Sequence, residues 1–164
     1  MTPTGPLTHL DDAGQARMVD VSGKQVTART ARATGRVLLS PAAIGALRAG
    51  QLPKGDALAV ARIAGIQAAK RTPDLIPLCH PIAIHAVSVD LQVTGDAVEI
   101  TALVRTADRT GVEMEALTCV TIAALALIDM IKAVDPAAVI SDVRVEEKTG
   151  GKTGSWRRPG GHSR

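Results

Sequence analysis

The centre of the predicted fold is "ALTCVTIAALALI", residues 116–128, an apolar run interrupted by two threonines. Glu115 precedes this run and Asp129 follows it, so its apolar length is 13 residues. A membrane span needs about 20 apolar residues, whereas a run of 10–14 is more typical of a buried helix. A helix that is apolar on every side must also be covered on every side. Because the chain is short, we expect a second subunit to supply part of that cover.

The segments around this helix predict an α+β sandwich, with helices on one face of a mostly antiparallel sheet. Alternation of small or apolar side chains with polar ones indicates half-buried strands. Helix starts are marked by Ser40 and Asp56 as N-caps, with Pro41 in the first turn, and Gly50 marks a stop. The expected elements are strands at 24–40, 83–94, 97–107 and 138–147, and helices at 41–50, 57–71 and 112–134.

Length and charge distribution predict one domain, residues 1–147 including an N-terminal arm, followed by a glycine-rich basic tail at 148–164. The tail holds five of the 19 basic residues and no acidic residue. Residues 1–147 therefore carry 14 basic against 16 acidic side chains. The positive charge is local, so the domain is not expected to bind polyanions in general.

Composition disfavours several classes of protein. Phe and Tyr are absent and there is one Trp, whereas modules for single-stranded nucleic acid use aromatic side chains for base stacking. The polar N-terminus, with Pro3, Gly5 and Pro6, predicts no signal peptide. Cys79 and Cys119 then read as free thiols of a cytoplasmic protein. We expect neither nucleic acid nor a membrane as partner.

Carboxylates at the two ends of the long helix are candidates for proton transfer. Glu113 and Glu115 either complement the positive helix N-terminus, which contributes about 0.3–1 kcal/mol, or act in chemistry. Asp129 lies in apolar surroundings with Lys132 three residues on, and the two form either a structural ion pair or a partly buried pair that handles protons. Fourteen residues separate Glu115 from Asp129, which is about 21 Å along a helix. We therefore expect an intersubunit site, made by a dimer whose long helices run antiparallel.

The motif "PLCHP" at 77–81 and Lys54 supply further candidates. Cys79 and His80 are adjacent in an extended segment, so they point to opposite sides and are poorly placed as a nucleophile–base pair. His80 is either a structural hydrogen-bonding residue or a site residue. Lys54, before Gly55-Asp56, is either a solvated lysine or an ammonium placed for anions at a helix N-terminus. The cysteines and histidines lack metal-ligand spacing, so no metal site is expected.

The C-terminal motif "EEKTGGKTGSW" at 146–156 contains Gly-Lys-Thr but is not a Walker A loop. That loop needs a glycine where Glu146 stands, and a helix directly after it. Two lysines on a glycine-rich segment, Lys148 and Lys152, are instead interpreted as a tail that closes onto phosphate groups.

Five motifs in order give the chain a resemblance to a known family. They are "LTHLDDAGQARMVDVSGK" (7–24), "KGDALAVARIAGIQAAKRTPDLIPLCHP" (54–81), "TGVEMEALT" (110–118), "DMIKAV" (129–134) and "KTGGKTG" (148–154). The chain closely resembles the molybdenum cofactor biosynthesis protein C family over nearly its whole length. This resemblance implies a ferredoxin-like α+β fold and a homohexamer built as a trimer of dimers, with active sites at the dimer interfaces.

The resemblance also implies a reaction, in which a phosphorus–oxygen lyase converts 3′,8-cyclised dihydro-GTP to cyclic pyranopterin monophosphate and releases pyrophosphate. Asp129 is then the expected general acid/base, with Lys132 as its partner. No cofactor is expected, and whether Mg²⁺ accompanies the triphosphate is left open. The implied catalytic residues are Asp129, Lys132, Lys54, His80 and Glu113, and the implied substrate-binding residues are Leu78, Cys79, His80, Met114, Glu115, Lys148 and Lys152.

Two other classes compete with an enzyme. A nucleotide- or RNA-binding module would use the basic tail, but it leaves unexplained an acidic residue within an apolar helix, which is costly without a purpose. An inert structural oligomer would explain the apolar helix, but it leaves the lysines and His80 without a use.

Overall fold

The computed structural model describes residues 9–152 and 154–160. The N-terminal residues 1–8, on which the absence of a signal peptide was predicted, and the last basic residue, Arg164, lie outside this range. The described elements are β1 (Thr27–Leu38), α1 (Pro41–Ala49), α2 (Ala57–Lys70), α3 (Thr72–Leu75), β2 (Ile84–Val93), β3 (Ala97–Asp108), α4 (Glu113–Ile131), β4 (Val139–Thr149) and β5 (Trp156–Arg157).

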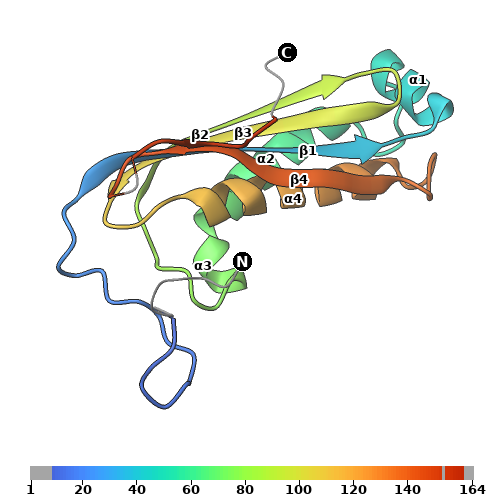
Figure 1. Cartoon of the computed structure of the whole chain (residues 1–164). Helices are drawn as coiled ribbons and strands as arrows, with labels where there is room; N and C mark the ends of the chain where they lie inside the picture. The colour runs from blue at the N-terminus through green and yellow to red at the C-terminus, as the bar shows by residue number, and fades with distance from the viewer. Residues whose placement is uncertain (1–8, 153, 161–164) are drawn as a thin grey trace.

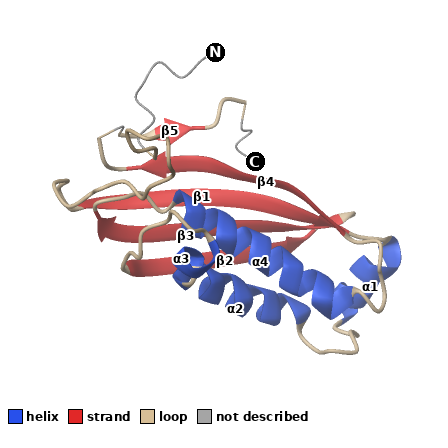
Figure 2. Cartoon of the chain, turned by 90° about the horizontal axis from the view of Figure 1, so that it is seen from below, coloured by secondary structure: helices blue, strands red, loops and turns tan. Residues whose placement is uncertain are grey.

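The strands form one antiparallel sheet in the order β2-β3-β1-β4-β5. Helices α2 and α4 pack side by side on one face of this sheet, and α1 lies at one end (Figures 1 and 2). The chain order of strand, helices, hairpin, helix and strand is that of a split βαβ, ferredoxin-like fold. The predicted α+β sandwich is therefore confirmed.

Local signals fixed the helix boundaries closely. The Ser40 side chain accepts a hydrogen bond from the backbone N–H of Ala43 at 3.3 Å, and Asp56 Oδ1 accepts one from Ala59 at 3.0 Å, so both are N-caps. Gly50 has φ 64° and ends α1 in the left-handed conformation that glycine favours. Strand β4 continues through Thr149, two residues past the boundary predicted at 147, and β5 adds part of the predicted tail to the sheet.

Helix α4 lies at the centre of the core. Its buried side chains include Val120, Leu127 and Ile131, which pack with the inward faces of β1 and β3. Among the described residues, α4 is the one helix with the length and apolar composition of a membrane span, yet more than half of that stretch is buried inside the protein. The core helices of globular domains satisfy the same criteria, and the packing of α4 is that of a core helix.

Within the single chain α4 is not covered on all sides, and the cover expected from a second subunit stays a prediction. Leu125 in the middle of α4 is 54% exposed, and on the neighbouring helix α2 the side chains of Val60 and Ile63 are exposed as well. Large apolar side chains of both helices therefore remain uncovered in the monomer.

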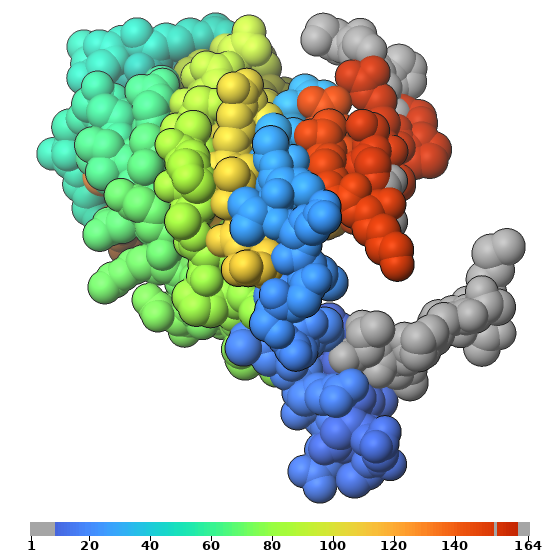
Figure 3. All heavy atoms as spheres, turned by 90° about the vertical axis from the view of Figure 1, so that its left-hand side faces the viewer, coloured from blue at the N-terminus to red at the C-terminus, as the bar shows by residue number. Residues whose placement is uncertain are grey.

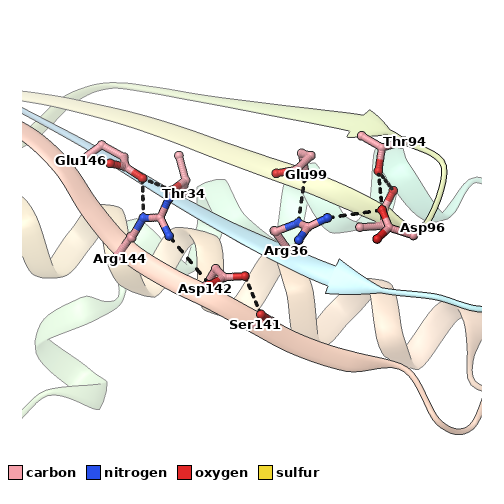
Figure 4. Close-up of polar contacts among 10 residues, drawn as sticks. Thr34, Arg36, Thr94, Asp96, Glu99, Ser141, Asp142, Arg144 and Glu146 are labelled. Carbon is pink, nitrogen blue, oxygen red and sulfur yellow. Dashed lines mark hydrogen bonds and ion pairs between the residues drawn. The ribbon is translucent and has the colours of Figure 1, made fainter. Parts of the chain in front are cut away.

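The opposite face of the sheet is polar (Figure 4). Arg36 on β1 pairs with Glu99 on β3 at 2.8 Å, and Arg144 on β4 pairs with Glu146 at 2.7 Å. Thr34 donates a further hydrogen bond to Glu146 at 2.8 Å. Of these contacts, Arg36–Glu99 and Thr34–Glu146 join neighbouring strands, and cross-strand pairs stabilise a sheet by about 0.2–1 kcal/mol each. Glu146, whose presence argued against a Walker A loop, is thus part of the sheet surface.

Candidate functional site

The N-terminal end of α4 forms one wall of an open cavity of about 420 Å³. Six of the predicted site residues line it: Leu78, Cys79, His80, Glu113, Met114 and Glu115. The loop before β2 carries the first three and the start of α4 carries the others. We call this region the acidic cavity, because two carboxylates from α4 face it.

Glu115 is the most enclosed carboxylate of the acidic cavity, with only 3% of its surface exposed. Burial raises the pKa of its carboxyl group above the usual range, and the nearby charge of Glu113 adds to this rise. A carboxyl group with a raised pKa holds its proton toward neutral pH and can donate it to a bound molecule. Glu115 was predicted as a substrate-binding residue, and its environment also suits it to proton transfer.

Glu113 and Lys148 join the start of α4 to the end of β4. Lys148 Nζ lies 3.0 Å from Glu113 Oε1, and about one third of each side chain is exposed. Lys148 enters this position because β4 continues past 147 and pairs with β1, where Lys148 is opposite Ala31. The ion pair therefore places a lysine of the predicted tail at the edge of the acidic cavity.

His80 is held by the N-terminal arm, residues 9–26. Its Nε2 atom lies 2.6 Å from the carbonyl oxygen of Val19. A carbonyl oxygen only accepts hydrogen bonds, so Nε2 carries a hydrogen and Nδ1 is the nitrogen at which a proton can be gained or lost. In Figures 1 and 3 the arm, drawn in blue, projects from the body of the molecule.

The two cysteines have different environments, and neither is activated. Burial raises the pKa of the Cys79 thiol, and the carboxylate of Glu115 raises it further. Burial also raises the pKa of Cys119 to about 12, since this side chain lies in the core between α4 and α2. Thiolates are the reactive form of cysteine, so nucleophilic catalysis by Cys79 is disfavoured, in agreement with the sequence interpretation.

The C-terminal end of α4 carries a second group, which we call the Lys–Asp–Lys cluster. Asp129 Oδ1 lies 2.7 Å from Lys132 Nζ, and Asp129 Oδ2 lies 2.8 Å from Lys54 Nζ. Lys54 also donates to the backbone carbonyl of Asp129 at 2.8 Å. The two ammonium groups offset the negative charge of the helix C-terminus, where an acidic side chain is otherwise unfavourable.

The prediction of a partly buried Asp129–Lys132 pair is wrong for the single chain, because the Asp129 side chain is 56% exposed. Asp129 comes at the point where α4 reaches the surface, and the apolar residues before it give no sign of this. Hydrogen bonds from Lys132 and Lys54 lower the pKa of Asp129 to about 2. In the monomer this carboxylate is therefore charged at neutral pH and accepts protons weakly.

The structure keeps the acidic cavity and the Lys–Asp–Lys cluster apart. Both lie on α4, whose unbroken helix separates Glu115 from Asp129 by 14 residues, or about 21 Å. Lys152 follows the glycine turn after β4 and is exposed. Within one chain the predicted site residues therefore form two groups rather than one.

Several residues of the acidic cavity were missed by the sequence interpretation. Four come from the N-terminal arm and two from the loop before α4: His9, Val19, Val21, Lys24, Thr110 and Gly111. The motif at 7–24 was the available signal, but it contains no pattern that shows where the arm folds. Within residues 9–152 and 154–160, no group of three or more His, Cys, Asp or Glu side chains is placed to hold a metal ion.

A buried carboxylate, an imidazole and a lysine around one cavity, with a Lys–Asp–Lys cluster on the same helix, are features of an enzyme that moves protons on an anionic small molecule. The chain belongs to the MoaC family, whose model matches residues 18–151. This confirms the resemblance found in the sequence.

Curated relatives agree with the family. The chain is 69% identical to the cyclic pyranopterin monophosphate synthase of Streptomyces coelicolor, over 95% of this chain and 92% of the relative. It is 71% identical to that of Streptomyces avermitilis, over 93% and 89% of the two chains. It is 57% identical to cyclic pyranopterin monophosphate synthase 2 of Mycobacterium tuberculosis strain H37Rv, over 94% and 93%.

Proposed function

We propose that this protein is a cyclic pyranopterin monophosphate synthase of molybdenum cofactor biosynthesis. It converts 3′,8-cyclised dihydro-GTP to cyclic pyranopterin monophosphate and releases pyrophosphate. The observation that carries this proposal is that six residues singled out by the family motifs line one cavity, in a chain whose relatives share that name.

The chemistry of the acidic cavity suits this reaction. Opening the purine ring, closing the pterin and forming a cyclic phosphate require protons to move in more than one step. Burial raises the pKa of the Glu115 carboxyl group, which favours its protonated form, and His80 has its Nδ1 free of the bond to Val19. Acid–base groups of these two kinds contribute about 10²–10⁴-fold each to a rate.

Lysines at the edges of both groups supply positive charge for the triphosphate. Lys148 reaches the acidic cavity through Glu113 at 3.0 Å, so a phosphate group there competes with the Glu113 carboxylate for the ammonium. Lys54 and Lys132 stand beside Asp129, where they bind anions and keep the carboxylate ionised. Lys152 adds a further cation after the glycine turn. Binding by several ammonium groups stabilises the charge that develops on the pyrophosphate leaving group.

The complete site forms between two subunits in this proposal. One chain contributes the acidic cavity, and its partner contributes the Lys–Asp–Lys cluster from an antiparallel α4 helix. The exposed apolar side chains Leu125, Val60 and Ile63 supply the surface that such a dimer buries. Association also excludes water from Asp129, which raises its pKa from the low value of the exposed side chain and makes it a more effective acid or base.

We further propose that the protein forms a homohexamer, built as a trimer of dimers, in the cytoplasm. We also propose that it acts without a cofactor. The molar mass in solution, measured by light scattering, tests the hexamer. Activity assayed with and without EDTA tests whether Mg²⁺ must accompany the triphosphate.

The function is tested by incubating purified protein with the cyclised GTP intermediate and measuring both pyrophosphate and the pterin product. We expect stoichiometric formation of the two from the wild type and their loss in Asp129→Ala. Asp90→Ala is the matched control, because it removes an exposed carboxylate from β2. Wild-type protein that releases no pyrophosphate would contradict the proposed function. Full activity in Asp129→Ala would contradict the role of Asp129.

A further inference from the structure

Arg29, near the start of β1, joins two segments that lead to the acidic cavity. Its Nε atom donates to the carbonyl oxygen of Asp108 at 3.0 Å, and its Nη2 atom donates to that of Arg109 at 3.2 Å. These carbonyls begin the loop that lines the cavity at Thr110 and Gly111 and enters α4 at Glu113. The rigid fork of the guanidinium group thus fixes the start of this loop.

The other side of Arg29 packs against the glycine turn that follows β4. Gly150 and Gly151 have φ values of 92° and 72°. A Cβ atom on Gly151 would overlap Arg29 Nη1 and lie 2.8 Å from Cζ. A Cβ atom on Gly150 would overlap the carbonyl oxygen of Ala28 and lie 3.1 Å from Arg29 Cγ. These two glycines are therefore required both by their backbone conformation and by the closeness of Arg29.

The two contacts of Arg29 lie on the two sides of the Glu113–Lys148 ion pair. The loop that it holds comes before Glu113, and the turn that it packs against comes between Lys148 and Lys152. One strand position further along, the hydroxyl groups of Thr30 and Thr149 are 2.6 Å apart, so β1 and β4 are closely joined here. Displacement of Arg29 would change the relative position of a carboxylate and two lysines together.

We infer that Arg29 is a positioning residue, which holds Lys148 and Lys152 in register with Glu113 for binding of a triphosphate group. This inference rests on the proposed function, since that function assigns the two lysines to the phosphates. Arg29 acts through the loop at 108–111 and the turn at 150–151.

A purely structural arginine on the same strand provides the matched control. Arg36 on β1 also links to β3, through Glu99 at 2.8 Å and through Asp96 in the following hairpin at 3.3 Å (Figure 4). Arg36 is opposite Ser141, near the start of β4. Arg29 precedes Thr30, which is opposite Thr149 at the end of β4. Loss of Arg36 therefore removes similar bonds at the opposite end of the strand.

Hydrogen–deuterium exchange tests the positioning directly, whether or not the protein turns over its substrate. We expect Arg29→Ala to speed exchange of the amides at 148–152 by about tenfold or more, because it removes the side chain against which the turn at 150–151 packs. Arg36→Ala should leave exchange of the same amides at the wild-type rate. Equal exchange in Arg29→Ala and wild type would overturn the inference.

Binding and kinetics test the link to phosphate. For Arg29→Ala we expect the Kd for tripolyphosphate and the KM for the cyclised GTP intermediate each to rise about tenfold, with kcat within about threefold of wild type. Arg29→Lys keeps one donor but not the fork, so its values should fall between the two. A fall in kcat at unchanged KM would overturn the inference. If instead the wild type is inactive but its affinity for tripolyphosphate depends on Arg29, only the proposed reaction is contradicted.

A double-mutant cycle separates the contact with Gly151 from general damage to the turn. Gly151→Ala should weaken tripolyphosphate binding more in the wild-type background than in Arg29→Ala, because only the strain of its positive φ remains once Arg29 is removed. Gly154→Ala is the control, since Gly154 also has a positive φ of 66° but a Cβ there meets open space among the described residues. Additive effects of Arg29→Ala and Gly151→Ala would show that the two act separately and would overturn the inference.

Discussion

The two ends of α4 carry acidic residues in opposite environments. At the N-terminal end Glu115 is 3% exposed and burial raises the pKa of its carboxyl group. At the C-terminal end Asp129 is exposed, and two lysines lower its pKa to about 2. The chain itself closes the first end with its N-terminal arm and the 78–80 loop, whereas the second end faces solvent in the monomer.

One part of the proposed site is therefore enclosed within a single chain, and the other is not. Glu115 is already buried within one chain, and this burial raises the pKa of its carboxyl group. The Lys–Asp–Lys cluster has its ion pairs but not its enclosure. A partner subunit that covers Leu125 and the neighbouring α2 side chains would bring the two kinds of environment together.

Complementation between inactive variants gives the largest expected effect. Glu113→Gln and Asp129→Asn should each lose about 10²–10⁴-fold in activity, because each removes one proton-transfer or charge-pairing group. If one site takes a residue from each chain, a mixed dimer has one intact and one doubly altered site. Random reassociation of the two variants should then restore about a quarter of wild-type activity.

The measurement is pyrophosphate release after the two variants are mixed, dissociated and reassociated. The control is each variant taken through the same procedure alone. Activity that stays at the level of the single variants would place both residues in the site of one chain and would contradict a site shared between subunits.

The raised pKa of Glu115 predicts a specific change in the pH profile. Glu115→Gln should lower kcat by about 10²-fold, since an amide cannot transfer a proton. It should also remove the limb of the kcat profile that falls with rising pH, because that limb reports loss of the Glu115 proton. A profile that keeps this limb, with pyrophosphate release as the readout, would assign the raised pKa to another group.

The sequence predicted the fold well because the relevant signals are local. Ser40, Gly50 and Asp56 fix the ends of helices through contacts within four residues. Alternation along β1 places Ala31, Ala33 and Val37 toward the helices and Arg32 and Arg36 toward the other face. Local patterns of this kind require no knowledge of distant parts of the chain.

The candidate site was predicted less completely because its contacts are distant in sequence. His80 meets Val19 across 61 residues, and Arg29 meets Asp108 across 79. The exposure of Asp129 depends on where the loop carrying Lys54 comes back to α4, which no periodicity reveals. The family motifs identified the residues, and the geometry shows how they are grouped into two clusters.

The close contact between α2 and α4 predicts a loss of stability when a methyl group is added to it. A Cβ on Gly65 of α2 would lie 2.9 Å from the carbonyl oxygen of Cys119 and 3.1 Å from Ala123 Cβ. Gly65→Ala should therefore lower the unfolding free energy by about 1–3 kcal/mol, since the α2–α4 contact has no room for a methyl group. Urea unfolding followed by circular dichroism provides the measurement.

The control for this change is Gly45→Ala in α1, where a Cβ meets open space among the described residues. Alanine is favoured over glycine within a helix, so this variant should gain about 0.5–1 kcal/mol. Similar stabilities for the two variants would mean that α2 and α4 separate at little cost, and that α4 is not the fixed element between the two clusters.

The smallest expected effect concerns stability against pH, and it has opposite signs at the two ends of α4. Asp129 has a folded pKa lowered from 3.8 to about 2, so its contribution is present above pH 3.8 and is lost as pH falls toward 2. Glu115 has a folded pKa raised above 4.5, so its contribution is present below pH 4.5 and is lost as pH rises through the folded value.

Asp129→Asn should therefore flatten the acid limb of the stability curve, whereas Glu115→Gln should flatten the limb on the neutral side. The Asp129 effect is expected to be small because exposed ion pairs are weakened by solvent and salt. Unfolding midpoints measured between pH 2 and pH 8 at low and high salt distinguish the two, since salt should reduce only the Asp129 effect. If association buries Asp129, its acid limb should become resistant to salt at protein concentrations that favour the oligomer, because a buried ion pair is screened much less than an exposed one.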